Sequence, residues 1–91
     1  MDFSAFPGAD VIARGVADLQ AQQTTIESLL VLIGAPRLRA VGIEIPSSSV
    51  TDPDHRLFEL LALSDPDGAH SRYNALLREL ISFERAAECA A

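Results

Sequence analysis

Two short segments of the chain combine the carboxylate and imidazole groups that could ligate a metal ion. Their members are Asp52, Asp54 and His55 in the first segment and Asp65, Asp67 and His70 in the second. Such oxygen and nitrogen ligands suit Zn²⁺ or Mn²⁺ when they converge on one point. Both segments also contain Asp-Pro-Asp, which is typical of a helix start, where aspartate caps the backbone and complements the helix dipole. We therefore interpret them as helix starts and expect neither a metal site nor a cofactor.

A further polar group consists of His70, Tyr73 and Asn74. His70 and Asn74 are four residues apart, which places them on one face of a helix. General acid–base catalysis needs a pocket and a second group beside the histidine, and the sequence indicates neither. We expect no catalytic residue and no enzymatic activity, and we keep the three residues as candidates for polar interactions. A small metal-binding or hydrolytic helical protein using His70 and nearby Asp residues is the second alternative.

Arg37 and Arg39 could begin the recognition helix of a helix-turn-helix over residues 26–45, with Gly34 in the turn. However, Pro36–Val41 is short for a helix that crosses a DNA groove, and the bulky Leu30 falls where a small residue is usual. The net charge of −6, from 13 acidic residues against seven Arg and no Lys, gives little attraction to phosphates. We expect no nucleic-acid partner, and a helix-turn-helix-like DNA-binding regulator is the first alternative.

The C-terminal part carries the strongest helical pattern in the chain. Its apolar residues step by four and three positions without a miss, at Ala69, Tyr73, Leu76, Leu80, Phe83, Ala87 and Ala90. One apolar residue per turn on a single stripe predicts a long amphipathic helix over about residues 66–89. Leu77 and Ile81 widen the stripe, as expected of a helix that is buried in a bundle.

The N-terminal part repeats this period. The stepping residues are Ile12, Val16, Leu19, Gln23, Ile26, Leu30 and Ile33, and they predict a long helix over about residues 9–33 that ends at Gly34. An alternative is a break before Thr25, because Thr24 and Glu27 fit the capping-box pattern. We favour one helix because the apolar register crosses the site. Gln23 then either lies within the apolar seam and fixes register or oligomeric state, or lies at its edge.

The predicted fold is a single all-α domain over residues 1–91. Residues 1–8 form a lead-in, short helices cover about 36–41 and 53–63, and residues 46–51 form a flexible connector. We expect the two long helices to pack antiparallel as the core of a small helical bundle. A chain of this size has a small core of its own, so we expect a homodimer to complete the bundle.

Composition indicates where the protein acts and what it binds. The single Cys89 cannot form an intramolecular disulfide, and the N-terminus lacks a basic region and an apolar core typical of signal peptides. The longest apolar run is far too short to span a membrane. We therefore expect a cytoplasmic protein without a membrane partner. The absence of Lys, together with abundant Ala and Arg, suggests a bacterial source.

A function follows only at the level of a class. An acidic chain suits a basic protein partner. We expect a non-enzymatic protein–protein interaction module of bacterial type, such as an inhibitor, an antitoxin-like protein or an adaptor, that acts through a helical surface.

Overall fold

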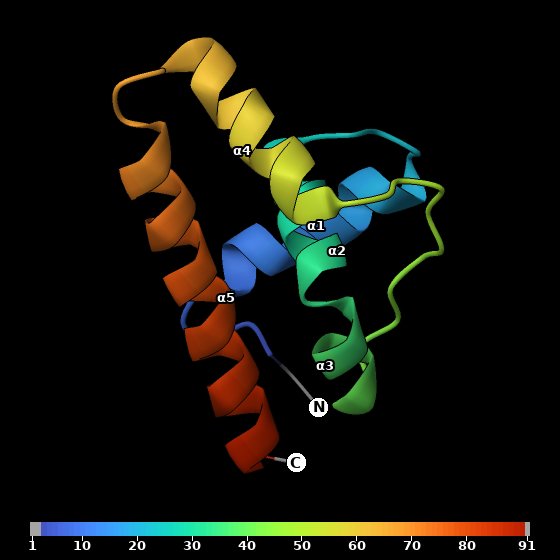
Figure 1. Cartoon of the computed structure of the whole chain (residues 1–91). Helices are drawn as coiled ribbons and strands as arrows, with labels where there is room; N and C mark the ends of the chain where they lie inside the picture. Colours follow the sequence, from blue (N-terminus) through green and yellow to red (C-terminus); the bar gives the residue numbers. More distant parts are fainter. Residues whose placement is uncertain (1–2, 91) are drawn as a thin grey trace.

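The computed structural model describes residues 3–90, and over these residues the chain forms five helices and no strand (Figure 1). The helices are α1 (Ala9–Gln20), α2 (Ile26–Ile33), α3 (Ala35–Ala40), α4 (Pro53–Ser64) and α5 (Ala69–Ala90). The prediction of an all-α fold is confirmed. Within the same residues, none of the helices combines the length and the apolarity that a membrane span requires.

Helix α2 occupies the centre of the fold. It packs on α1 most extensively, on α4 next, and also on α5 and α3. Its residues Leu29, Leu30 and Val31 are completely buried, which agrees with the all-round apolar composition of this turn. Helix α5, the red helix along one side of Figure 1, packs mainly on α4 and also covers α2.

The close contact between α1 and α2 depends on Gly15. A Cβ atom at this position would overlap the carbonyl oxygen of Glu27 and the Cγ2 atom of Val31. Glycine costs about 1 kcal/mol of helix propensity relative to alanine, so its place inside α1 has a packing reason. The two helices can approach each other this closely because residue 15 has no side chain.

The predicted long helix over residues 9–33 is wrong, because the structure has two helices there. Helix α1 ends at Gln20, and Gln22 adopts a left-handed conformation with φ 59°. Helix α2 then begins with a capping box in which the Thr25 hydroxyl accepts from the Ser28 N–H at 3.1 Å. In return, the Ser28 hydroxyl accepts from the Thr25 N–H at 2.7 Å. These local hydrogen bonds outweigh the continuous apolar register.

The alternative with a break was therefore correct, although the cap lies at Thr25 and not at Thr24. The Thr25 hydroxyl also donates to the Asp18 carboxylate at 2.6 Å, which ties the start of α2 to α1. Gln23 lies in the connecting loop and is exposed. Both positions considered for Gln23, within the apolar seam or at its edge, assumed a continuous helix, and neither is realised because the helix is interrupted there.

The other helices agree more closely with the sequence pattern. Helices α3 and α4 lie within one residue of the predicted ranges 36–41 and 53–63. Helix α5 begins three residues later than predicted, because residues 66–68 form a turn in which the Asp65 carboxylate accepts from the Gly68 N–H at 3.0 Å. Asp52 precedes α4 in a left-handed conformation, and its side chain makes no capping bond, so its expected capping role is not realised.

The apolar stripe of α5 is confirmed along most of its length. Ala69, Leu80, Phe83 and Ala87 are buried, Tyr73 and Leu76 are half-buried, and Ala90 is exposed. The expected antiparallel pair of long helices is not formed, because only α5 is long. Shorter helices surround α2 instead, and the apolar residues of both sequence patterns are largely buried within one chain.

The segments outside the helices also contact the core. In the lead-in, the rings of Phe3 and Phe6 lie 5.9 and 6.1 Å from the ring of Phe83 on α5. The first two residues of the predicted lead-in lie outside the described residues. The irregular segment that includes the predicted connector 46–51 is anchored by Ile45, which is buried next to it.

Candidate functional site

The site that we consider lies where α3 approaches α5. Gly34, between α2 and α3, makes this approach possible. A Cβ atom there would lie 2.7 Å from Cδ1 of Leu80 and 2.8 Å from Oε2 of Glu84. The φ angle of Gly34 is −91°, so the left-handed conformation that is usual for a helix-terminating glycine is not used. Close packing against α5 explains the glycine instead.

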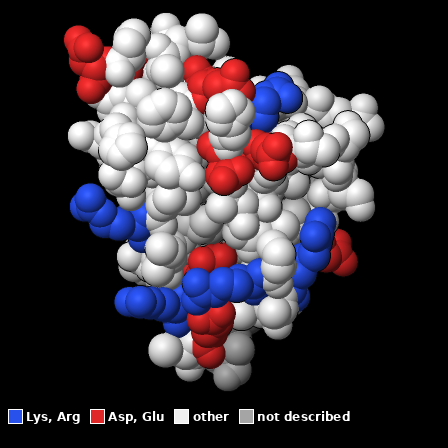
Figure 2. Space-filling model, in the orientation of Figure 1, with Lys and Arg blue, Asp and Glu red and all other residues white. Residues whose placement is uncertain are grey.

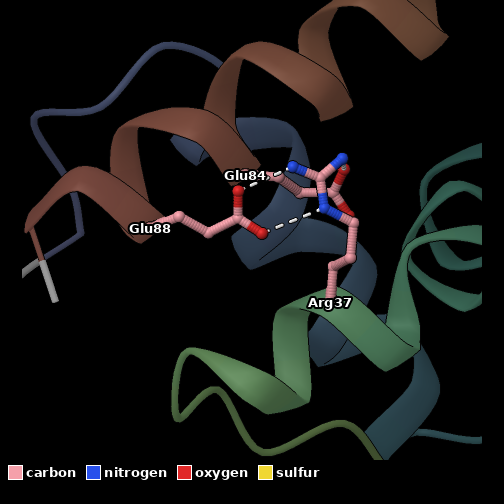
Figure 3. Close-up of polar contacts among 3 residues, drawn as sticks. All are labelled: Arg37, Glu84 and Glu88. Carbon is pink, nitrogen blue, oxygen red and sulfur yellow. Dashed lines mark hydrogen bonds and ion pairs between the residues drawn. The ribbon is translucent and has the colours of Figure 1, made fainter.

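Arg37 connects the two helices through two carboxylates that are one turn apart on α5 (Figure 3). Its Nε and NH2 groups donate to the two oxygens of Glu88 at 3.0 and 2.7 Å, in a fork geometry. Its NH1 atom lies 3.1 Å from Oε1 of Glu84. Such a bidentate contact fixes the direction of the guanidinium more than it stabilises the fold, because Arg37 and Glu88 are partly exposed.

Glu84 differs from Glu88 because it is buried, with only 2% of its surface exposed. Its Oε1 atom faces Arg37, but no atom of residues 3–90 donates a hydrogen bond to its Oε2 atom. Burial raises the pKa of Glu84 above its ordinary value and outweighs the opposite effect of the Arg37 charge. For Glu88, the hydrogen bond from Arg37 lowers the pKa.

A groove with a volume of about 240 Å³ runs beside this carboxylate. It is lined by Ile33, Gly34, Pro36, Arg37, Leu77, Leu80, Ile81 and Glu84. Ile81 is 39% exposed and, with Leu63 at 81%, is one of the two large apolar side chains that are exposed among the described residues. The groove therefore has mainly apolar walls and lies next to a buried carboxylate, one oxygen of which has no hydrogen-bond partner among residues 3–90.

Charge around the groove is mixed. Figure 2 shows mainly acidic side chains on the upper half of this face, over α4 and the start of α5, and both signs on the lower half. The three residues of the α3–α5 contact, Arg37, Glu84 and Glu88, have a formal charge of one negative unit when all are ionised.

The structure distributes the sequence-predicted residues over separate surfaces. Arg37 belongs to the groove, whereas Arg39 donates to the carbonyl oxygen of Ile45 at 3.0 Å. The rings of His70 and Tyr73 both lie edge-on to the ring of Phe58. Their centres are 5.8 Å and 5.9 Å, respectively, from the centre of the Phe58 ring.

The remaining predicted residues lie on other surfaces. Asn74 is exposed. Gln23 contributes to a separate hollow of about 380 Å³ that the serines at 47–49 also line.

The Asp and His segments do not form a ligand set. Within residues 3–90, no three His, Cys, Asp or Glu side chains are close enough to hold one metal ion. His55 lies 3.5 Å from Glu59, its neighbour one turn later on α4.

Sequence reasoning missed Glu84 and Glu88. A signal for Glu84 was present, because it follows Leu77 by seven residues and Leu80 by four, and so continues an apolar row of α5. An isolated acid within such a row indicates a buried charge. The partner Arg37 is 51 residues away from Glu88 and could be found only through the tertiary structure.

Comparisons of the chain with protein-family models, with curated proteins and with solved structures each gave no match.

Proposed function

We propose that the protein is a non-catalytic protein-binding module and that the α3–α5 groove receives a segment of its partner. The observation that supports this most directly is the exposed Ile81 side chain in a groove that Glu84 also lines, where the buried Oε2 atom of Glu84 has no hydrogen-bond partner within residues 3–90. Apolar anchors that fill a pocket next to a few placed polar groups are typical of binding sites.

The size of the groove favours a side chain over a small-molecule ligand. Pockets for drug-sized molecules have volumes of roughly 300–1,000 Å³, and this groove has about 240 Å³. One or two side chains from the surface of another protein fit this scale. Leu77 and Ile81 lie one turn apart on α5 and provide an apolar edge on which the rest of the partner segment can pack.

The charge of the chain favours a different protein over a second copy. A net charge of −6 makes two copies repel each other, whereas a basic partner is attracted. The homodimer expected from the sequence stays a prediction. The apolar residues on which it relied, including Leu30, Leu80 and Phe83, are buried within one chain.

The helix-turn-helix alternative gains little from the structure. Helix α3 has six residues, and both of its arginines already contact acceptors within the chain. A recognition helix needs side chains that are free to reach base edges or phosphates.

The proposed function is tested with random peptides displayed on phage and selected on the folded protein. Ile81→Asp should weaken binding of the selected peptides by roughly tenfold or more, because it places a charge on the apolar edge of the groove. Leu63→Asp is the matched control, since it makes a similar change at an exposed residue outside the groove, and it should leave binding unchanged.

Two results would contradict the proposal. Peptides that bind the parent and Ile81→Asp equally well would place binding elsewhere. Light scattering that shows a dimer for the parent and a monomer for Ile81→Asp would assign the groove to a second copy of the chain.

A further inference from the structure

We infer that the α3–α5 groove receives an amphipathic helix of another protein, which places an apolar side chain in the groove and carboxylates on Arg78 and Arg85. This inference rests on the proposed function and names the chemistry of the partner segment. Arg78 and Arg85 are exposed, and their guanidinium groups make no hydrogen bond or ion pair with residues 3–90.

The two arginines border the groove on either side of Ile81. Ile81 lines the groove, and Arg78 precedes it by three residues while Arg85 follows it by four. Residues at these spacings are neighbours on one face of a helix. Figure 2 shows arginine side chains along the edge of α5 on the lower half of this face. The groove therefore has apolar walls and, along α5, a basic edge.

The acidic side chains near this edge are already engaged or lie elsewhere. Arg37 donates two hydrogen bonds to Glu88 (Figure 3), and this contact chiefly lowers the pKa of Glu88, whereas the charge of Arg85 contributes least. Glu84 is buried and faces Arg37. Glu79 lines a separate hollow with residues of the lead-in. Two guanidinium groups without an acceptor remain, and carboxylates are the acceptors that match their geometry.

The net charge of −6 does not oppose an acidic segment at this place. The upper half of the face in Figure 2, over α4 and the start of α5, carries mainly acidic side chains. Salt at physiological strength screens exposed charges that are more than about 8 Å apart. A partner that is basic over the rest of its surface is still attracted by the whole chain, while the segment in the groove responds to the two arginines.

The groove favours a helix over an extended segment. Its longer wall, from Leu77 to Glu84, lies inside α5, where the backbone groups bond within the helix. An extended segment beside this wall would find no backbone groups to pair with. A helix bonds its own backbone internally and offers one apolar face, which is a recurring way of binding to grooves.

The spacing of the arginines sets the pattern of the partner helix. Arg78 and Arg85 are seven residues apart, which corresponds to about 10.5 Å along the helix axis. A helix that packs along α5 presents carboxylates at this separation when two acidic residues are seven positions apart. An apolar residue three or four positions after the first acid lies on the same face. Its side chain fits a groove of about 240 Å³.

The sequence of the chain excludes a second copy as the source of this helix. Asp52 and Glu59 are its only acidic residues that are seven positions apart. His55 and Arg56 stand between them, at the positions where the apolar residue is required. The occupant is therefore a segment of a different protein.

The experiment selects phage-displayed helical peptides with one fixed leucine and random residues around it. On the parent protein, Asp and Glu should be enriched on both sides of the leucine, seven positions apart. On the double variant Arg78→Glu with Arg85→Glu, the same positions should change to Lys and Arg. Arg56→Glu with Arg72→Glu is the matched control, since it has the same net charge and changes exposed residues that do not line the groove. It should keep the acidic preference.

A second measurement uses a selected peptide that loses binding to Ile81→Asp. Calorimetry should show that changing either acid of the peptide to Gln weakens binding to the parent roughly threefold, as for an exposed ion pair. The same change should have no effect on binding to Arg78→Gln with Arg85→Gln. Proline between the acids should weaken binding more than tenfold because it interrupts a helix, whereas alanine there should not.

The outcomes separate the two proposals. Peptides that depend on Ile81 but show no acidic preference, or keep it on Arg78→Glu with Arg85→Glu, would overturn the inference and leave the binding function standing. Equal binding of the proline and alanine peptides would overturn the helical form of the occupant and thus the inference. If no selected peptide is sensitive to Ile81→Asp, the proposed function fails and the inference fails with it.

Discussion

The α1–α2 contact and the α3–α5 contact solve the same packing problem with different results. In both, a glycine allows two helices to approach closely, at Gly15 in the first and Gly34 in the second. At the α1–α2 contact, the polar groups of Asp18, Thr25 and Ser28 all have hydrogen-bond partners within the chain. At the α3–α5 contact, Oε2 of Glu84 has none within residues 3–90.

This difference separates a contact in which the polar groups satisfy one another from a contact that leaves a buried acceptor without a donor among residues 3–90. A satisfied polar group adds order to the native state, whereas a buried, unsatisfied one lowers stability unless another molecule completes it. Binding sites often retain such a cost because it becomes specificity when the ligand arrives. The following three predictions test the contrast, beginning with the largest effect.

Gly15→Ala should destabilise the protein by about 2–3 kcal/mol, because the added Cβ overlaps the backbone of α2 and forces the helices apart. The loss should occur although alanine is the better helix former. Thermal unfolding followed by circular dichroism measures it. Ala17→Gly on the exposed side of α1 is the control and should cost only about 1 kcal/mol from helix propensity. An unchanged melting temperature for Gly15→Ala would show that α1 and α2 do not cross closely at this point.

Thr25→Val should destabilise the protein by about 1–2 kcal/mol, since it removes the cap of α2. It also removes the hydrogen bond to Asp18. Thr24→Val is a matched control because it makes the same change at the adjacent, exposed residue. Urea unfolding of the two variants distinguishes the positions of the cap. A larger loss of stability for Thr24→Val than for Thr25→Val would show that the cap lies at Thr24, as the sequence pattern indicated.

Glu84→Gln should change the pH dependence of stability, with a smaller effect than either substitution above. Burial raises the pKa of Glu84 above its ordinary value of 4.5, so the folded chain binds this proton more tightly than the unfolded chain. The stability from this group is present below the ordinary pKa and is lost as pH rises through the folded-state pKa.

In the Glu84→Gln variant this loss is absent. The stability of the variant relative to the parent should therefore increase as the pH rises from about 4 to 7. The midpoint of urea unfolding at several pH values measures this difference. Glu88 contributes the opposite dependence, because its pKa is lowered, but it is present in both proteins. Glu79→Gln is the control for removing an exposed charge from the same helix. A difference that falls with pH would mean that the Arg37 ion pair dominates over burial.

The helices were predictable from the sequence to different degrees, and the reasons are local. The apolar row of α5 and the Asp52-Pro53 pair at the start of α4 indicated these helices to within a few residues. The break before Thr25 was less clear, because the apolar register and the capping pattern indicated opposite results. The capping prediction succeeded because Thr25 and Ser28 are only three residues apart and can bond each other without distant segments. An apolar register stabilises a continuous helix only if both halves face one surface.

The candidate site could not be predicted in the same way. Arg37 was selected as a possible contact to DNA, and its observed partners lie on the last helix of the chain. Gly34 was interpreted as a helix terminator, and its main role is to admit Leu80 and Glu84. Both interpretations used neighbours in the sequence, while the deciding contacts come from residues more than 40 positions away.

The sequence by itself determined that the chain is helical and which face of α5 is buried, because these follow from the spacing of apolar residues along one segment. Only the tertiary structure decided that α2 is central, that Gln23 is exposed and that Glu84 is buried beside an apolar groove. The physical reason is that burial of a charge, and the lack of a donor for it, depend on every segment that packs around it.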